Sequence, residues 1–418
     1  MTLNPLCNSC CAHVEQLVDF GEHPIVNKLA HDPNEVAKKH RMIVGGCISC
    51  GLVQLTQPID PIEFYTDYAT PTSWKREPHI GKLLNRLRAV VPREDRILDV
   101  GCNDGRFLTY LRDSGWSKLT GLEPSKNTAE SAKSQGFDIV NSSLTSALAD
   151  ELVMTEGSWG CVILRQVLEH VVNLTDFGSA LNRLLRRDGI LVIEVPDSRV
   201  NMLQHDYALW EEHVNYFTPA TLEHFLKAHG FEIFDMYTSA FSGVCLTVLA
   251  RNVGNSSDEG ILGSRPSAPS LSEQIGTFRA WASDFPAFRA AIANEVADYA
   301  NRSQVALYGV GSRSSNFINI MNLGELISLA IDDQPQKQNC FMPGSGTAIV
   351  SSSDAAEQLR PNSCLLLGVN GENEEFLLTS SPLMQVHFSI SVLPPSRRLL
   401  NAWGSIKARS EFSALQSP

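Results

Sequence analysis

The stretch Ile97-Leu98-Asp99-Val100-Gly101-Cys102-Asn103-Asp104-Gly105 decides the fold class of this chain. In it an apolar strand pattern runs into a turn bounded by two glycines, and a helical pattern follows from Phe107 to Ser114. Glycine permits a sharp turn and a close approach of the backbone to a ligand, as in the first loop of nucleotide-binding folds. The stretch therefore predicts the first strand, loop and helix of a doubly wound α/β sheet.

Further strand patterns follow on the carboxyl side of this stretch. Short apolar runs that alternate with helical segments are typical of a parallel sheet. The last run, Val244–Ala250, is expected to be an antiparallel strand at the sheet edge. The other predicted strands are Leu119–Glu123, Cys161–Leu164 and Ile190–Glu194, and a helix is predicted over Asn127–Gln135.

A second unit with the same succession of elements comes later in the chain. Asn252–Ser270 is rich in Ser, Gly, Asn and Pro and is expected to be a linker. A helical pattern over Leu271–Ala300 contains Pro286, where we expect an interruption. The segment Val305–Ser312 is a strand pattern that ends in a glycine turn, and a later apolar run ends at Asp332. We therefore expect an α/β chain with two Rossmann-like doubly wound sheets.

The composition limits the classes of function. The chain has 418 residues, 43% of them hydrophobic, which is enough for real cores. Its 34 basic and 46 acidic side chains give a net charge of −12, which disfavours nucleic acid and anionic membrane surfaces as partners. No apolar run approaches the roughly 20 residues of a membrane-spanning helix, and the first residues lack the pattern of a secretory signal. We expect a soluble, cytoplasmic protein.

Half of the ten cysteines lie in the first fifty residues, and four of these form two Cys-x2-Cys pairs. The pairs are Cys7 with Cys10 and Cys47 with Cys50. Four thiolates satisfy a tetrahedral Zn2+ and leave no open position, so this metal would be structural. Reduced cysteines in a small core and a redox pair are the alternatives, and Cys11, His13 and His40 are competing ligands. The pattern predicts a small zinc-binding module over residues 1–70.

The turn after Val100 also indicates a cofactor. Glu123 ends the next strand, where an acid can accept both hydroxyls of a ribose. The Cys-Asn-Asp between Gly101 and Gly105 departs from the G-x-G-x-x-G of dinucleotide enzymes and favours S-adenosylmethionine over NAD. Asp99 would orient the methionine end of that cofactor; a plain strand-to-helix turn is the alternative. The predicted cofactor-binding residues are Asp99, Gly101, Asn103, Asp104, Gly105, Glu123 and Gln166.

Two side chains after Cys161–Leu164 are expected at the carboxyl edge of the sheet, where open α/β folds bind ligands. Gln166 would face the sulfonium region of the cofactor. His170 would face the reacting centre, although a helix cap or a polar pocket explains it equally well. This places a candidate catalytic histidine beside the cofactor.

A second candidate for the chemistry is the run Glu211-Glu212-His213-Val214-Asn215-Tyr216-Phe217. It precedes a helix whose start is marked by Thr218 and Pro219. His213, with an ordinary pKa of about 6.5, suits general-base work near neutral pH, and a neighbouring carboxylate would raise its basicity. A solvated acidic loop with a capping histidine is the alternative.

In the second unit, the glycine turn and its neighbours suit a nucleotide or a sugar diphosphate. Glycines and a helix N-terminus accommodate anionic oxygens, and Arg313 adds a bidentate phosphate donor. Asp332 would accept ribose hydroxyls, and Lys337 supplies further positive charge. NAD is disfavoured because a third glycine is missing from the turn. A domain that only braces the first sheet is the alternative.

The combined motifs resemble the bacterial sugar C-methyltransferases, which methylate the carbon next to a ketone on nucleotide-linked deoxysugars. The resemblance covers nearly the whole chain. It is carried by the four-cysteine module, Asn-Asp-Gly in the first loop, Leu-Glu-His after the fourth strand, Glu-His-Val-Asn-Tyr-Phe, and the segments Leu17–Gly21, Cys50–Leu55 and Asp332–Gly344. It implies a zinc module (1–70), a methyltransferase domain that binds S-adenosylmethionine (71–251), a linker (252–270) and a Rossmann-like domain that binds the nucleotide-sugar (271–418).

The resemblance also implies roles for individual residues. His213 would be the base that forms an enolate, with Glu212 orienting it or contacting sugar hydroxyls, and with His170 nearby. The expected substrate contacts are Tyr68, Trp210, Glu211, Asn215, Tyr216, Tyr308, Arg313, Asp332 and Lys337. Trp210 and Thr70 stand where the family has tyrosines, and Arg313 where a lysine is more common. Methylation at oxygen or nitrogen, or a non-catalytic scaffold, therefore remain alternatives, and the oligomeric state stays open.

Overall fold

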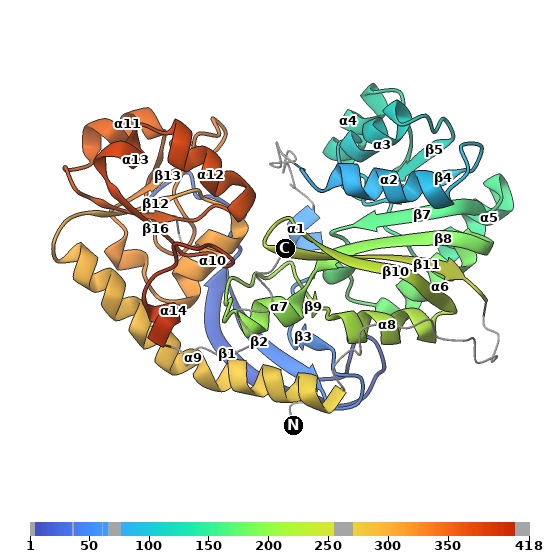
Figure 1. Ribbon diagram of the computed structural model, residues 1–418, viewed down its shortest axis with the longest axis horizontal. Coiled ribbons are helices and arrows are strands. Elements are labelled where there is room, and N and C mark those ends of the chain that lie inside the picture. The colour runs from blue at the N-terminus through green and yellow to red at the C-terminus, as the bar shows by residue number, and fades with distance from the viewer. Residues whose placement is uncertain (1–4, 36, 61, 66–76, 255–270, 406–418) are drawn as a thin grey trace.

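The computed structural model describes residues 5–35, 37–60, 62–65, 77–254 and 271–405. Three sheets make up this part of the chain. Figure 1 shows two α/β lobes with the N-terminal strands between them and one long helix running beneath. The fold class predicted from the sequence is confirmed: two mainly parallel α/β sheets accompany a small module that carries a cysteine cluster.

The N-terminal sheet is antiparallel and contains one strand from far along the chain. Its order is β1-β2-β3-β9. The strands are β1 (Val14–Pro24), β2 (Lys39–Cys47), β3 (Val53–Leu55) and β9 (Asn215–Tyr216), and the short helix α1 (Ile62–Tyr65) follows β3. Val53 pairs with Tyr216, and Gln54 pairs with Asn215. The module that holds the cysteines is thereby joined to the segment just after His213.

The central sheet has seven strands in the order β10-β11-β8-β7-β4-β5-β6. Its strands are β4 (Ile97–Val100), β5 (Leu119–Leu122), β6 (Asp138–Val140), β7 (Trp159–Arg165), β8 (Leu185–Pro196), β10 (Phe231–Ala240) and β11 (Val244–Asn252). Its helices are α2 (Ile80–Val90), α3 (Arg106–Asp113), α4 (Lys126–Ser134), α5 (Ser146–Glu156), α6 (Leu174–Leu184), α7 (Ser198–Leu203) and α8 (Pro219–Ala228). The five strands from β4 to β8 run parallel, and β11 is antiparallel to β8.

One prediction about this sheet is wrong. Strand β11 is antiparallel, as expected, but β10 and not β11 forms the sheet edge. The two strands form a hairpin, and β10 keeps several exposed or half-exposed side chains while β11 is almost fully buried. An edge strand that is only partly covered shows a weak apolar pattern, which explains why the sequence did not reveal it.

The C-terminal sheet is parallel, in the order β14-β13-β12-β15-β16. Its strands are β12 (Val305–Tyr308), β13 (Leu329–Ile331), β14 (Ile349–Val350), β15 (Cys364–Leu367) and β16 (Phe388–Ser391). Its helices are α10 (Ser312–Ile320), α11 (Ser352–Gln358), α12 (Gly371–Ser380), α13 (Leu383–Val386) and α14 (Ala402–Ser405). The strand, glycine turn and helix predicted here are β12, the residues after Tyr308, and α10.

The long helix α9 (Leu271–Ala300) connects the lobes, and the interruption expected at Pro286 is wrong because the helix continues through it. Proline removes one backbone hydrogen bond and strains the preceding turn. The helix here buries apolar side chains on both sides of Pro286, including Trp281, Phe285 and Phe288. Burial stabilises each of them by roughly 1.5–3 kcal/mol, enough to offset one weakened turn.

An aromatic cluster on α9 fixes the three parts against one another. Phe20 of β1 packs edge-on against Phe285, with ring centroids 4.8 Å apart. Tyr207 stacks on Trp281 at 4.7 Å and on Phe288 at 5.3 Å. Such ring pairs add about 0.5–1.5 kcal/mol beyond their buried area. The cluster therefore anchors the segment that leads from α7 to Trp210 and His213.

Among the helices of the described residues, none combines the length and apolar character that a membrane crossing requires.

Candidate active site

Two turns bring four cysteine sulfurs together next to β1 and β2. The Sγ atoms of Cys7 and Cys50 lie 3.5 Å apart, and those of Cys10 and Cys47 lie 3.4 Å apart. All four are within 4.8 Å of one another. Zinc–sulfur bonds of about 2.3 Å in a tetrahedron hold sulfurs about 3.8 Å apart, so the set fits Zn2+. The hydrogen bond between Cys7 and Cys50 lowers the pKa of the Cys7 thiol to about 5 and raises the pKa of the Cys50 thiol.

The competing ligands named from the sequence lie outside this set. Cys11 is exposed, and neither His13 nor His40 belongs to a metal-capable cluster of the described residues. Cys11 and Gly51 instead have positive φ angles of 58° and 74°, which let the backbone wrap around the sulfurs. The four cysteines thus form a closed structural zinc site.

The predicted cofactor loop connects β4 to α3 through three residues with positive φ. These are Gly101 at 73°, Asn103 at 50° and Gly105 at 84°. A Cβ atom on Gly101 would lie 2.5 Å from Cγ2 of Val167, so the loop packs directly on the segment after β7. Only glycine combines this φ with this close contact.

Two acids flank the loop, as the sequence predicts. Asp99 is 3% exposed, and burial raises its pKa to about 7. Glu123 accepts the backbone N–H groups of Asn103 and Ser125, each at 2.9 Å, and burial raises its pKa. Asp104 accepts the N–H of Arg106 at 3.2 Å. The loop and its acids therefore form one polar edge at the carboxyl ends of β4 and β5.

Gln166 follows β7 with a φ of 54°. Its amide nitrogen Nε2 is buried and has no hydrogen-bond partner among the described residues. A buried donor without a partner suits a ligand acceptor. Together with carboxylates that can receive an ammonium group and ribose hydroxyls, this donor makes the residues present fit S-adenosylmethionine.

Sequence reasoning missed a charged cluster beside Gln166. Arg165 donates to Glu77 at 2.7 Å and to Glu194 at 3.2 Å. His79 Nε2 lies 3.1 Å from a Glu194 carboxylate oxygen. These charges come from three distant segments. The only sequence signal was the position of Arg165 at the carboxyl end of a strand that faces the cofactor loop.

The two predicted catalytic histidines lie together. The rings of His170 and His213 are perpendicular, with centroids 4.8 Å apart. Burial lowers the pKa of His170 to about 4, and it lowers the pKa of His213 well below its usual value, with further contributions from His170 and Arg313. Both imidazoles are thus neutral bases. The ring of Trp210 lies 3.7 Å from that of His213.

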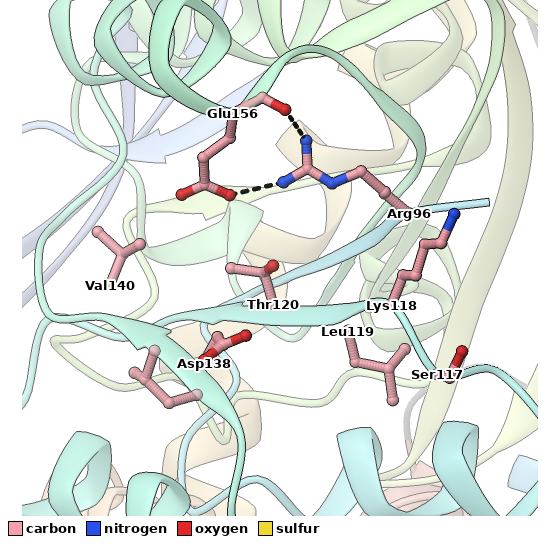
Figure 2. Close-up of a pocket in the computed structure, with 9 residues that line it drawn as sticks. Arg96, Ser117, Lys118, Leu119, Thr120, Asp138, Val140 and Glu156 are labelled. Carbon is pink, nitrogen blue, oxygen red and sulfur yellow. Dashed lines mark hydrogen bonds and ion pairs between the residues drawn. The ribbon is translucent and has the colours of Figure 1, made fainter. Parts of the chain in front are cut away.

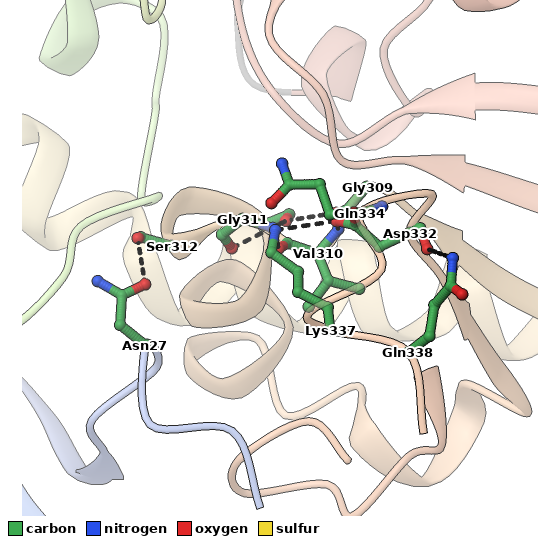
Figure 3. Close-up of polar contacts among 10 residues, drawn as sticks. Asn27, Gly309, Val310, Gly311, Ser312, Asp332, Gln334, Lys337 and Gln338 are labelled. Carbon is green, nitrogen blue, oxygen red and sulfur yellow. Dashed lines mark hydrogen bonds and ion pairs between the residues drawn. The ribbon is translucent and has the colours of Figure 1, made fainter. Parts of the chain in front are cut away.

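The two carboxylates before His213 are held by the N-terminal module. Glu211 accepts the N–H of Val26 at 2.7 Å, and burial raises its pKa to about 8. Glu212 accepts from the side chain of Asn27, whose own oxygen accepts from Ser312 Oγ at 2.7 Å. Figure 3 shows Asn27 facing Ser312 at the start of α10. The link through Asn27 was also missed, because a single Asn in a loop carries no pattern.

The other residues predicted beside His213 lie in strand β9. Asn215 donates to the carbonyl of Val171 at 2.7 Å and accepts from Asn8 at 3.0 Å. It therefore joins the zinc module to the segment that follows His170. The hydroxyl of Tyr216 is buried without a partner among the described residues. Tyr68 and Thr70 lie outside the described residues.

A cavity of about 200 Å3 opens at the glycine turn of the C-terminal sheet. Its lining includes Trp210 and Ser242 from the central lobe, together with residues 309–314, Asp332 and Lys337. Lys337 donates to Asp332 at 3.0 Å and to the carbonyl of Val310, as Figure 3 shows. Tyr308 does not line this cavity; its hydroxyl donates to Asp333 at 3.0 Å. Arg313 is buried against Asp206.

A wider hollow of about 610 Å3 lies at the amino ends of β5 and β6, away from all of these residues. Figure 2 shows Arg96 and Glu156 paired at its rim. Ligands of open α/β sheets bind at the carboxyl ends of strands. Its position in the sheet therefore favours the smaller cavity, which is lined by Trp210, as the ligand site.

Three known sequence families match successive parts of the chain. Residues 7–65 match a zinc binding domain family, residues 74–235 match a methyltransferase domain family, and residues 269–377 match a C-methyltransferase C-terminal domain family. The last match is to a domain of C-methyltransferases. In its order of domains, the chain matches the C-methyltransferase family with an N-terminal zinc module. The protein is an enzyme, a methyltransferase that uses S-adenosylmethionine and holds a structural zinc.

Solved structures similar to this chain include three from microorganisms. A SAM-dependent methyltransferase from Anabaena variabilis is 16% identical, with 46% of this chain and 90% of that chain covered and a TM-score of 0.37. Magnesium protoporphyrin IX methyltransferase from Synechocystis is 17% identical (41% and 77% covered, TM-score 0.32). A SAM-dependent methyltransferase from Archaeoglobus fulgidus is 18% identical (41% and 93% covered, TM-score 0.33). A comparison with curated protein sequences gave no match.

Proposed function

We propose that this methyltransferase methylates the carbon next to the ketone of a nucleotide-linked deoxy-keto-sugar. The observation that carries the proposal is the position of Trp210. Its side chain lines the cavity at the C-terminal glycine turn, and its ring lies 3.7 Å from the ring of His213. A ligand held at the glycine turn would therefore extend toward a buried, neutral base.

His213 takes the proton in this reaction. A buried imidazole with a lowered pKa is unprotonated at neutral pH, so it can accept a proton from the carbon next to the ketone. The electrons of that C–H bond move into the enolate. S-adenosylmethionine, when bound, supplies a methyl group activated by its positively charged sulfur. Asp99, Glu123 and Gln166 orient this cofactor, and His170 packs against the base.

The C-terminal domain holds the nucleotide in this proposal. Lys337 has one ammonium hydrogen left after its bonds to Asp332 and Val310, and it lines the cavity. Asp332 accepts the N–H of Val310 at 3.0 Å and keeps lone pairs for ribose hydroxyls. The guanidinium of Arg313 already donates hydrogen bonds to Asn370, Asp206 and the carbonyl of Pro394. Its main effect on an anionic ligand would therefore come from its positive charge.

Glu212 has a supporting role. The backbone carbonyl of Glu212 accepts from His170, while its carboxylate is tied to Asn27 of the zinc module. It therefore contacts sugar hydroxyls or orients the histidine pair, and it is not the base. Trp210 offers one N–H and cannot exchange a proton as the tyrosine of related enzymes would, which makes methylation at oxygen or nitrogen the second candidate.

The test is solvent exchange at the substrate. Nucleoside diphosphate-linked deoxy-keto-sugars are incubated with the protein in D2O without cofactor, and deuterium at the carbon next to the ketone is measured by NMR. We expect wash-in with the wild type and with His224→Ala, whose histidine is exposed, and none with His213→Ala. Equal wash-in in His213→Ala would remove His213 from this role. With 13C-methyl cofactor, a product signal of an O-methyl or N-methyl group would overturn carbon methylation.

A further inference from the structure

Glu169 is a buried acid that the proposed reaction does not use. It is 1% exposed, and neither of its carboxylate oxygens has a hydrogen-bond partner among the described residues. Burying polar oxygens without partners costs several kcal/mol in an apolar setting, so such a group calls for a bound ion or a function. One ligand atom each of Glu169, His170 and His213 lies within 4.8 Å of the others.

His170 is oriented as a metal ligand. Its Nδ1 atom lies 2.8 Å from the backbone carbonyl oxygen of Glu212. A carbonyl only accepts hydrogen bonds, so Nδ1 carries the proton and the lone pair is on Nε2. A backbone carbonyl behind one ring nitrogen is the usual support for a histidine that binds a metal through the other nitrogen.

His213 completes the set. Its ring is perpendicular to that of His170, and no hydrogen bond reaches its ring nitrogens within the described part of the chain. Trp210 packs on its face and limits its rotation. Small side-chain movements would bring the three ligand atoms to the separations that bonds of about 2.1 Å require.

We propose that Glu169, His170 and His213 form a second metal site that binds one divalent transition-metal ion. Two imidazoles and one carboxylate with open positions suit Zn2+, Co2+, Ni2+ or Fe2+. The site differs from the four-cysteine site because it has no sulfur ligand and its coordination is incomplete. Another group with suitable ligands, around Glu194, is already occupied: Arg165 and His79 both contact that carboxylate.

The metal site has a consequence for catalysis that rests on the proposed function. The lone pair of His213 that coordinates a metal cannot accept the proton of the substrate at the same time. The metal-bound form is therefore inactive in deprotonation, and a divalent transition metal acts as an inhibitor that competes for the base.

Cobalt(II) is the probe. Zinc-loaded protein is dialysed against Co2+, and bound metal is measured by elemental analysis and by X-ray absorption at the cobalt edge. We expect one Co2+ per chain in addition to zinc, surrounded by nitrogen and oxygen only. Glu169→Gln and His170→Asn should weaken Co2+ binding at least about tenfold, while His224→Ala binds as the wild type does. The coordination shell is read on the wild type, so it is informative even if a variant fails to fold.

Three results would overturn the site: no Co2+ bound beyond zinc by the folded wild type, a cobalt shell that contains sulfur, or unchanged binding in folded Glu169→Gln and His170→Asn. The activity assay separates the two proposals. If Co2+ binds with the expected shell but deuterium wash-in continues, the metal site stands and His213 is not the base. If wash-in is normal and Co2+ does not bind, the metal site falls and the proposed function stands.

Discussion

Arg313 donates to the carboxylate of Asp206 across 2.5 Å and thereby ties the start of α10 to the segment that leads to Trp210. Both side chains are buried. Arg313 also donates to Asn370 at 2.6 Å and to the carbonyl of Pro394 at 3.1 Å. Burial is the main cause of the low pKa of His213, and the charge of Arg313 lowers it further, so the contact that docks the C-terminal domain also helps to keep this candidate base neutral.

Arg313→Ala is expected to destabilise the protein strongly. It leaves the Asp206 carboxylate buried and unpaired, which typically costs about 3–5 kcal/mol. The double variant Asp206→Ala/Arg313→Ala should be less destabilised than the sum of the two single variants, as thermal unfolding will measure. The matched control is Arg279→Ala, which breaks an exposed ion pair with Glu15 between α9 and β1. An exposed pair contributes little, so a control as damaged as Arg313→Ala would contradict the prediction.

Loss of zinc is expected to impair catalysis through the zinc module. Asn8, between two of the cysteines, donates to Asn215 at 3.0 Å and to Gln54 Oε1 at 2.8 Å, and Asn215 follows His213 by two positions. Cys50→Ser should lose zinc and lower kcat far more than affinity for S-adenosylmethionine, because β4 and its loop lie in another sheet.

Cys11→Ser is the control for this prediction. Its thiol is exposed and lies outside the four-sulfur cluster. Metal analysis should find one zinc ion per chain in Cys11→Ser, and its turnover should equal that of the wild type. Zinc retained by Cys50→Ser, or lost from Cys11→Ser, would contradict the assignment of the four ligands.

The affinity for S-adenosylmethionine should depend on pH through Asp99. Burial raises the pKa of Asp99 to about 7. Only the ionised carboxylate attracts an ammonium group, so affinity should rise with pH up to about 7 and then level off, and below that pH binding should release a proton. Each pH unit below 7 lowers affinity by at most about tenfold. Calorimetry in buffers of different ionisation enthalpy measures the proton release.

The raised pKa of Asp99 also affects stability, which should fall as the pH rises, whereas the affinity for the cofactor should increase. The folded pKa of Asp99 lies above that of the unfolded chain, so its contribution to stability is present below about pH 4 and is lost as the pH rises through 7. Asp99→Asn should remove the pH dependence of both quantities. Its binding of S-adenosylmethionine should be weak and independent of pH, and its free energy of unfolding should vary less with pH. If the affinity of Asp99→Asn still rises toward pH 7, another group is responsible.

Much of this architecture could be predicted because it rests on local sequence. The turn at Gly101 requires positive φ and close packing on Val167, which only glycine allows. Thr218 and Pro219 mark the start of α8 by capping, and the structure contains that capping hydrogen bond. The Cys-x2-Cys spacing of the two cysteine pairs can be read directly from the sequence. In each case one short segment holds all of the information.

The missed features depend on contacts between distant segments. β9 is two residues long and exists because β3 pairs with it, so it has no pattern of its own. Glu169 lies in the Leu-Glu-His motif beside His170, and nothing in the local sequence distinguishes a buried acid without partners from an exposed one. Pro286 was expected to break a helix whose packing on Phe20 was not visible in the sequence.

Asn27 connects all three parts of the protein at the candidate site, and its substitution tests whether that connection matters. Its amide nitrogen donates to Glu212, and its oxygen accepts from Ser312 at 2.7 Å. Asn27→Ala removes both contacts. Asn27→Asp keeps the acceptor for Ser312 but places a second carboxylate against Glu212, so charge repulsion is added to the lost bond.

Asn27→Asp should therefore be the more damaging variant. Repulsion of about 1.4 kcal/mol that displaces Glu212, and with it the backbone carbonyl that orients His170, would lower kcat/KM about tenfold. Steady-state kinetics of both variants measures this, with Asn301→Asp at an exposed position after α9 as the control for added charge. If Asn27→Ala and Asn27→Asp lose the same activity, the hydrogen bonds alone matter and the charge of Glu212 does not. If neither loses activity, the bridge through Asn27 positions nothing that the reaction needs.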